Sequence, residues 1–159
     1  MINPSLPLID LHRHMDGNVR LETILDLSRQ HNLELPAWTI DGLRPYVQVT
    51  QPRPGVMAFI DKFKWMIGVL VDYNACQRIA YENVEDAFRK KIDYVELRFS
   101  PWFMAEPHGL DPIGVVEAVV DGDRGRVADP ARLPPAAGAE RASPAPVGPV
   151  VTADGVPVA

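Results

Sequence analysis

The chain has 159 residues, of which 47% are apolar, and its formal net charge is −5 at pH 7. This length suits a single domain with its own core, and the negative charge argues against nucleic acid or an anionic membrane as a partner, because both reward clusters of Lys and Arg. No stretch reaches the ~18 consecutive apolar residues of a membrane span, and no secretory signal is visible. The single cysteine excludes a disulfide within the chain and fits a reducing compartment. We therefore expect a cytoplasmic location.

The first predicted element is a short strand over residues 6–12, "LPLIDLH", whose apolar residues fall on both parities as in a strand covered on both faces. Residues 20–32 follow as an amphipathic helix that ends before Pro36. Residues 39–55 contain three prolines and two glycines, and they predict a loop with at most a brief helical turn.

Two further helices are predicted in the middle of the chain. Residues 56–71 repeat bulky apolar side chains at helical spacing. Residues 75–91 form the next helix, which Asp72 or Asn74 would cap.

The last predicted elements are a second strand and one more helix. Residues 92–101, "IDYVELRFSP", are rich in residue types that favour strands. Asp111 is the expected N-cap of a helix over residues 111–122, and Gly122 its expected stop. The order strand, helices, strand, helix predicts an α/β fold with parallel strands.

The C-terminal residues 123–159 differ in composition from the rest. Seven of the sixteen prolines lie between Pro130 and the end, and no aromatic residue follows Phe103. Such a segment cannot bury enough surface to offset its chain entropy. We therefore predict one folded unit over residues 1–122 and a disordered, low-complexity tail over residues 123–159.

Four polar residues alternate at the end of the first strand, in the segment "LIDLHRHMDG": Asp10, His12, His14 and Asp16. Side chains two residues apart in a strand share a face, so all four are predicted to project the same way. Two imidazoles there can reach one zinc ion at about 2.0–2.1 Å, and a carboxylate can fix a ligand's other ring nitrogen. A strand's exit is also where parallel α/β folds place their sites. The pattern predicts half of a zinc site at His12 and His14, and the alternative is a pair of structural histidines.

The remaining candidate ligands are predicted to have no part in this site. His31 lies at the polar end of a helix, where we expect it to be exposed, and His108 lies in a loop where a surface position is favoured. Cys76 is expected on a helix face, without the P-C-x-x-C element of the cytidine-type deaminases. Catalytic zinc needs three protein ligands, and the sequence pattern supplies two.

The segments "LPLIDLHRHMDGNVR", "ACQRIAYENVEDA" and "YVELRFSP" occur in this order and at separations that resemble the N-terminal part of adenosine deaminases, which are metal-dependent amidohydrolases on a TIM (β/α)8 barrel. The resemblance runs from about Leu6 to about Gly122, with Met15 where the family normally has leucine. It implies about two β/α units of the barrel plus lid helices. It also implies that His12 and His14 are zinc ligands, that His14 lies close to the nucleoside, and that Asp16 binds the sugar.

The helix around "MAFIDKFKW" falls where this family builds an apolar lid over the purine. Phe59, Ile60 and Phe63 are therefore candidates for the lid, and packing in the core is the alternative for each of them.

In the second strand Tyr94, Glu96 and Arg98 share one parity. They either support the barrel interior at the edge of the site or form an internal ion pair, and both interpretations stay open.

The reaction that the resemblance implies is hydrolytic deamination of adenosine to inosine and ammonia, with one zinc ion as cofactor and a purine nucleoside as the small-molecule partner. In the family a third histidine ligand, an acid glutamate, a positioning histidine and a closing aspartate come from later strands, and none has a counterpart here. We therefore expect this chain to be a truncated, inactive form. The Ala, Arg, Gly and Pro bias after Gly122 leads to the hypothesis of a frameshift.

Two alternatives stay open at this point. The enzyme class could be retained with adenine or an N6-modified adenosine nucleotide as substrate. The chain could instead be a non-catalytic remnant or interaction fragment, because two of eight barrel units leave strand edges unpaired. The sequence does not predict an oligomeric state.

Overall fold

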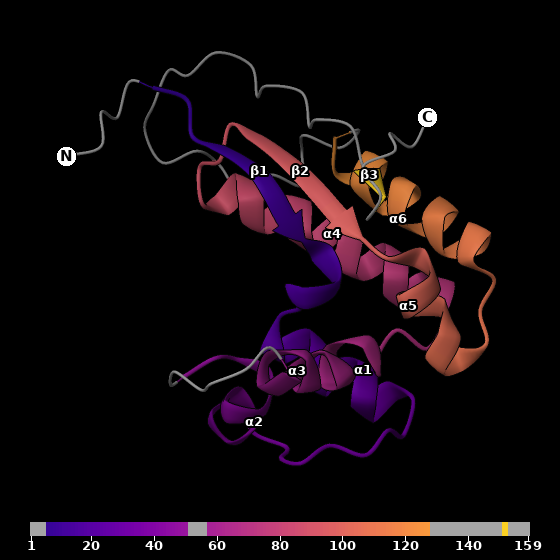
Figure 1. Cartoon of the computed structure of the whole chain (residues 1–159). Coiled ribbons are helices and arrows are strands. Elements are labelled where there is room, and N and C mark those ends of the chain that lie inside the picture. The colour runs from indigo at the N-terminus through magenta and orange to yellow at the C-terminus, as the bar shows by residue number, and fades with distance from the viewer. Residues whose placement is uncertain (1–5, 51–56, 128–150, 153–159) are drawn as a thin grey trace.

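The computed structural model describes residues 6–50, 57–127 and 151–152. Its sheet contains β1 (Ile9–His14), β2 (Tyr94–Phe99) and β3 (Val151–Thr152), in the order β1-β2-β3 and with both pairs parallel. Figure 1 shows α4 and α6 packed behind the sheet, and α1, α2 and α3 grouped beyond the end of β1. The predicted α/β class and the parallel pairing of the first two strands are confirmed.

The helices are α1 (Leu21–Gln30), α2 (Ile40–Val47), α3 (Met57–Ile67), α4 (Tyr73–Arg89), α5 (Pro101–Ala105) and α6 (Pro112–Val127), with 3-10 turns η1 (Met15–Gly17) and η2 (Glu106–His108). Of the two predicted alternatives Asp72 and Asn74, Asp72 is the cap, because it accepts a hydrogen bond from the Ala75 backbone N–H at 2.8 Å. The predicted cap Asp111 is confirmed, because it accepts a hydrogen bond from the Ile113 backbone N–H at 3.0 Å. Each carboxylate satisfies an amide that has no partner within its helix.

The prediction of a loop over residues 39–55 is wrong where the structure describes them, because α2 occupies residues 40–47. Thr39 caps the helix by accepting from the Gly42 N–H at 3.2 Å. Leu43 and Val47 are buried one turn apart, and this packing outweighs the presence of Pro45 inside the helix. Residues 51–56 lie outside the described residues.

The predicted stop of the last helix at Gly122 is also wrong, since α6 continues to Val127. Gly122 is buried, and a Cβ there would collide with the backbone oxygen of Gln77 and lie 2.9 Å from the Ala80 side chain. The glycine therefore allows α6 to approach α4 closely and does not end the helix.

The main core joins the helices to the carboxyl ends of the strands, and its largest fully buried side chains include Phe99, Met15, Ile24, Leu43 and Leu70. A smaller cluster of Val84, Ala87, Val95 and Leu97 fills the space between α4 and β2. Only one face of β2 is fully buried: its alternate residues Val95, Leu97 and Phe99 point toward the helices.

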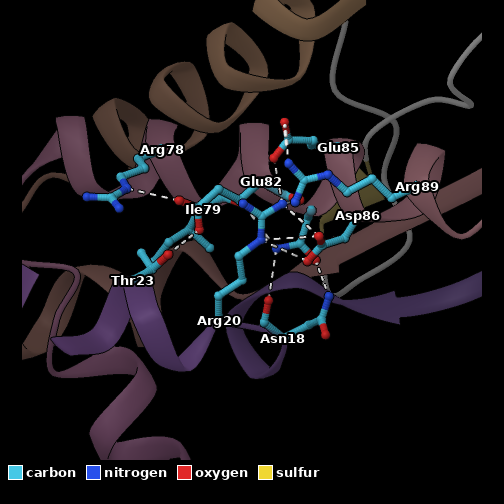
Figure 2. A network of polar contacts seen from close by, with 10 residues as sticks. Asn18, Arg20, Thr23, Arg78, Ile79, Glu82, Glu85, Asp86 and Arg89 are labelled. Atoms are coloured by element: carbon cyan, nitrogen blue, oxygen red, sulfur yellow. Dashed lines mark hydrogen bonds and ion pairs between the residues drawn. The ribbon is translucent and has the colours of Figure 1, made fainter. Parts of the chain in front are cut away.

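A polar network ties the start of α1 to α4, and Figure 2 shows it from close by. Arg20 donates to Asp86 at 2.6 Å and to Glu85 at 2.7 Å. Asn18 and Asn83 exchange hydrogen bonds of 2.7 and 3.2 Å. These contacts join segments more than sixty residues apart in sequence, so they hold the turn that follows β1 against the helix behind the sheet.

The predicted disordered tail falls mostly on residues 128–150 and 153–159, which lie outside the described residues. Two described parts of that segment are ordered, contrary to the prediction: residues 123–127 continue α6, and Val151–Thr152 pairs with Arg98 and Phe99 of β2. Within the described ranges, no helix is long and apolar enough to cross a bilayer.

Candidate metal centre

The two histidines of the predicted half site meet at the end of β1. Their Nε2 atoms are 3.1 Å apart and their ring planes are tilted by 53°. Both residues are exposed on the sheet. The strand extends through His14, two residues further than predicted, so both histidines belong to β1.

Asp16 lies directly after the strand, in η1, and its side chain is buried. Its Oδ2 accepts a hydrogen bond from the Ser100 N–H at 3.2 Å, and its Oδ1 lies 3.5 Å from Nδ1 of His14. That second separation is within ion-pair range but lacks hydrogen-bond geometry, which leaves Oδ1 without a hydrogen-bond partner among the described residues. Burial raises the pKa of Asp16, while the Ser100 amide and His14 oppose the rise.

Asp10 does not share the face of the histidines, and this part of the prediction is wrong. The β1–β2 register shifts between Asp10 and Arg13, where three steps on β1 correspond to two steps on β2. This irregularity reverses the alternation of side chains. Asp10 instead pairs with Arg13, whose Nε and Nη2 lie 2.9 Å from Asp10 Oδ2. It is therefore not a partner of the two imidazoles.

The helix α3 packs directly on the turn that carries Asp16. The ring of Phe63 is so close to Gly17 that a Cβ on this glycine would lie 2.8 Å from two ring carbons. Phe63 is half-buried and contacts Phe59 edge to face at a centroid distance of 5.2 Å, while Phe59 and Ile60 are exposed. An apolar, partly exposed helix face thus stands next to the site, although the sequence alone did not reveal the contact at Gly17.

The polar row of β2, which consists of Tyr94, Glu96 and Arg98, lies on the same side of the sheet as the histidines. Arg98 is the register partner of His14 in the parallel pair, and register partners point to the same face. Tyr94 donates to Glu96 at 3.1 Å, and Arg98 lies 3.9 Å from Glu96. The ion-pair interpretation is confirmed by the contact between Arg98 and Glu96, whereas a supporting role at the edge of the site stays a prediction.

The other histidines and the cysteine stand apart from this site. His31 is half-buried at the end of α1, so its predicted exposure is wrong, and Nε2 of the half-buried His108 lies 3.0 Å from the Gly68 carbonyl oxygen. Cys76 lies on α4, a helix as predicted, and the structure shows that it is buried. Burial raises its pKa to about 12, so the thiol is a poor nucleophile and metal ligand.

The donor set fits two of the ligands of a zinc ion. Two nitrogens at about 2.0–2.1 Å from a tetrahedral zinc are about 3.3 Å apart, close to the 3.1 Å between the Nε2 atoms of His12 and His14. Asp16 faces the opposite ring nitrogen of His14, as carboxylates that orient histidine ligands do. Among the described residues, no group of three or more His, Cys, Asp and Glu is placed to hold a metal.

Ser100 is the contributor that sequence reasoning missed. It holds Asp16 through its backbone amide, a group that every residue except proline carries, and no sequence signal marks it. The strand end and the Asp16 turn are thereby joined across 84 residues of sequence.

Two solved structures share the fold of this chain over part of their length. An N6-mAMP deaminase from Arabidopsis is 27% identical, with a TM-score of 0.58, over 76% of this chain and 35% of that one. An amidohydrolase from Burkholderia ambifaria with bound Zn has a TM-score of 0.62 at 22% identity, over 78% of this chain and 33% of that one. At that identity the second likeness shows a shared fold alone.

Sequence comparison identifies the family more directly. An adenosine deaminase from Pseudoalteromonas translucida is 60% identical over 122 residues, which are 77% of this chain and 37% of that enzyme. This chain therefore spans little more than a third of that relative. A sequence profile of adenosine deaminases matches residues 7–129, past the predicted end at Gly122. Because this match covers most of the chain, the protein belongs to the adenosine deaminase family.

Proposed function

We propose that the chain carries the N-terminal part of a zinc-dependent adenosine deaminase. In this proposal His12 and His14 are two of the zinc ligands, and Asp16 binds a hydroxyl group of the sugar. The observation that supports it best is the 3.1 Å separation of the two Nε2 atoms, because it lets both nitrogens face one cation. Zinc, when bound, would supply an activated water for hydrolysis near neutral pH.

The chain's own residues have distinct parts in this proposal. Oδ1 of Asp16 lies 3.5 Å from Nδ1 of His14, so the Nε2 of His14 is the ring nitrogen on the side of His12. Ser100 holds one carboxylate oxygen of Asp16, and the other oxygen has no hydrogen-bond partner among the described residues. A carboxylate oxygen in that state accepts a hydrogen bond from a hydroxyl group, which a nucleoside's sugar offers.

The exposed face of α3 supplies the apolar surface next to this site. Phe59 and Ile60 are half-exposed and Phe63 anchors the helix on the Gly17 turn. A purine ring is flat and largely apolar on its faces, so aromatic side chains can cover it and exclude water. We propose Phe59, Ile60 and Phe63 as the residues of this lid.

Adenosine is the favoured substrate, because the relative named an adenosine deaminase is 60% identical whereas the N6-mAMP deaminase is 27% identical. The likeness to the latter supports an N6-modified adenosine nucleotide as the second candidate. The Asp16 carboxylate weighs against it, since a negative charge at the sugar position repels a phosphate group.

A chimera separates these substrates. Residues 7–127 of this chain would replace the corresponding part of the Pseudoalteromonas adenosine deaminase, and ammonia release would be measured with adenosine, adenine and N6-methyl-AMP. We expect turnover with adenosine to exceed turnover with the other two, with wild-type relative as the control. A chimera that prefers N6-methyl-AMP would establish the second candidate instead.

The chain by itself is proposed to be inactive. It has four histidines, and His31 and His108 lie away from the site, whereas catalytic zinc takes three protein ligands. We expect no ammonia release from adenosine by the purified chain. Turnover at the rate of the full-length relative would contradict this proposal, because it would show that the chain supplies the third zinc ligand by itself.

A further inference from the structure

Asn83 is a fully buried amide on α4, with 1% of its surface exposed. Its Oδ1 accepts a hydrogen bond from Nδ2 of Asn18 at 2.7 Å, and its own Nδ2 donates to the carbonyl oxygens of Asn18 at 3.2 Å and of Ile79 at 3.0 Å. Because the nitrogen faces two acceptors and the oxygen faces a donor, these contacts determine the orientation of the amide. Both contacts that leave α4 go to Asn18, one to its side chain and one to its main chain.

A buried amide is costly to desolvate, and an apolar side chain in its place would have no such cost. What Asn83 adds over apolar packing is direction, because a hydrogen bond requires a particular distance and angle. Its two bonds to Asn18 fix both the position and the rotation of that residue against α4. The two residues are 65 positions apart in the sequence.

Asn18 closes the turn that carries Asp16 (Figure 2). This turn, η1, spans Met15–Gly17, and the Asn18 N–H donates to the Met15 carbonyl oxygen at 3.1 Å. Asp16 is the middle residue of the turn. A displacement of Asn18 relative to α4 therefore displaces the backbone from which the Asp16 carboxylate projects.

The Asp16 carboxylate has little tolerance for such a displacement. Its Oδ2 accepts from the Ser100 N–H at 3.2 Å, which is at the long end of the usual range of about 2.7–3.2 Å. A shift of a few tenths of an ångström away from Ser100 would break this bond. Ser100 thus holds the carboxylate from the end of β2, while Asn83 holds its turn from α4.

We propose that Asn83 is a positioning residue for Asp16. It keeps the turn where Oδ2 stays on the Ser100 amide, so that Oδ1, which has no hydrogen-bond partner among the described residues, stays directed at the substrate. This inference rests on the proposed function, in which Asp16 binds a hydroxyl group of the sugar. Asn83 itself touches no substrate, and its effect on binding passes through Asp16.

The first test uses the full chain and needs no activity. Hydrogen exchange of the Ser100 amide, followed by NMR, reports the bond to Asp16, and the Val115 amide in α6 is the internal reference. In Asn83→Ala we expect Ser100 protection relative to Val115 to fall about fivefold or more, as for the loss of a hydrogen bond to a charged group. Asn18→Ala, at a half-buried residue, should give a smaller loss and serves if Asn83→Ala does not fold.

Thr23→Val is the matched control for the loss of a buried polar contact. Thr23 is buried and donates to Glu82 of the same helix at 2.5 Å, and valine keeps its shape without the hydroxyl group. This bond joins α1 to α4 away from the Asp16 turn. We expect Thr23→Val to lower stability as Asn83→Ala does and to leave the relative protection of Ser100 unchanged.

The second test measures the consequence for substrate binding in the chimera with the Pseudoalteromonas enzyme. Asn83→Ala should raise KM for adenosine about threefold or more, part of the effect of losing a charged hydrogen bond, and the zinc content should stay unchanged. Thr23→Val should leave KM unchanged. In an Asp16→Asn background, Asn83→Ala should have no further effect on KM, because residues that act through one contact are not additive.

Three outcomes overturn the inference in distinguishable ways. Equal Ser100 protection in Asn83→Ala and Thr23→Val would show that Asn83 contributes stability alone. A rise in KM that persists in the Asp16→Asn background would show that Asn83 does not act through Asp16. An unchanged KM in Asp16→Asn alone would refute the proposed sugar contact and with it the effect on binding, whereas the exchange of Ser100 tests the positioning of the turn independently.

Discussion

Nη2 of Arg20 lies 2.6 Å from Oδ1 of Asp86 and 2.7 Å from Oε2 of Glu85 (Figure 2). Arg20 directly precedes α1 and follows the Asp16 turn by four residues. Its side chain retains 22% exposure, so the pair is partly shielded from water. The ion pair therefore fixes the segment that follows His12 and His14 to α4, which lies behind the sheet.

Arg20→Ala should destabilise the fold because it leaves Glu85 and Asp86 as neighbouring carboxylates with one cation fewer. We expect a loss of about 2–3 kcal/mol in the free energy of unfolding, as for partly buried charged hydrogen bonds. Urea denaturation followed by circular dichroism measures it. Arg44→Ala is the matched control, since Arg44 pairs with the exposed Asp41 at 3.9 Å and such pairs contribute about 0–1 kcal/mol. Equal losses for both variants would contradict a structural role for Arg20.

Gly17→Ala should disturb the contact between the Asp16 turn and α3. The new methyl group would lie 2.8 Å from two carbons of the Phe63 ring, and overpacking of this kind costs about 1–3 kcal/mol. Urea denaturation again provides the measurement. Adding Phe63→Leu should recover part of the loss, because leucine lacks the colliding ring carbons. A double variant less stable than Gly17→Ala would show that the ring is not the cause.

Asp123 gives a pH dependence to stability. Its carboxylate is buried on α6 with no hydrogen-bond partner for either oxygen among the described residues. Burial raises its pKa from 3.8 to about 7, so between these values the folded chain binds more protons than the unfolded chain. Its contribution to the free energy of unfolding therefore falls as pH rises from about 4 to about 7 and is constant above that range.

Asp123→Asn should remove this slope and stabilise the chain at pH 8 by on the order of 2–4 kcal/mol. Denaturation midpoints between pH 4 and pH 8 provide the measurement. Asp121→Asn, an exposed carboxylate on the same helix, is the control and should preserve the wild-type slope. An unchanged slope in Asp123→Asn would show that this carboxylate does not carry the pH dependence.

Asp16→Asn, introduced into the chimera, should separate substrate binding from metal binding. Asparagine keeps the size of the side chain but loses the negative charge that accepts the sugar hydroxyl. We expect KM for adenosine to rise about tenfold or more, the effect of losing a charged hydrogen bond, while the zinc content stays unchanged. Loss of zinc with unchanged KM would instead assign Asp16 to the metal.

The sequence alone was sufficient for several features because they depend on local spacing. Side chains two residues apart in a strand share a face, which placed His12 and His14 together. Asp111 was recognisable as a cap from its position before an apolar helical repeat, and Asp72 was one of two candidates for the other cap. The parallel α/β class followed from the order of the elements.

Other features were decided only by tertiary structure, because they depend on residues that are distant in the chain. The shift of register against β2 turned Asp10 away from the histidines, and packing of Leu43 and Val47 made a helix of a proline-containing segment. Gly122 ends a helix in the sequence pattern but supports close packing in the fold. Asp16 is held by a backbone amide 84 residues away, and no local pattern can encode a partner that folding itself brings into contact.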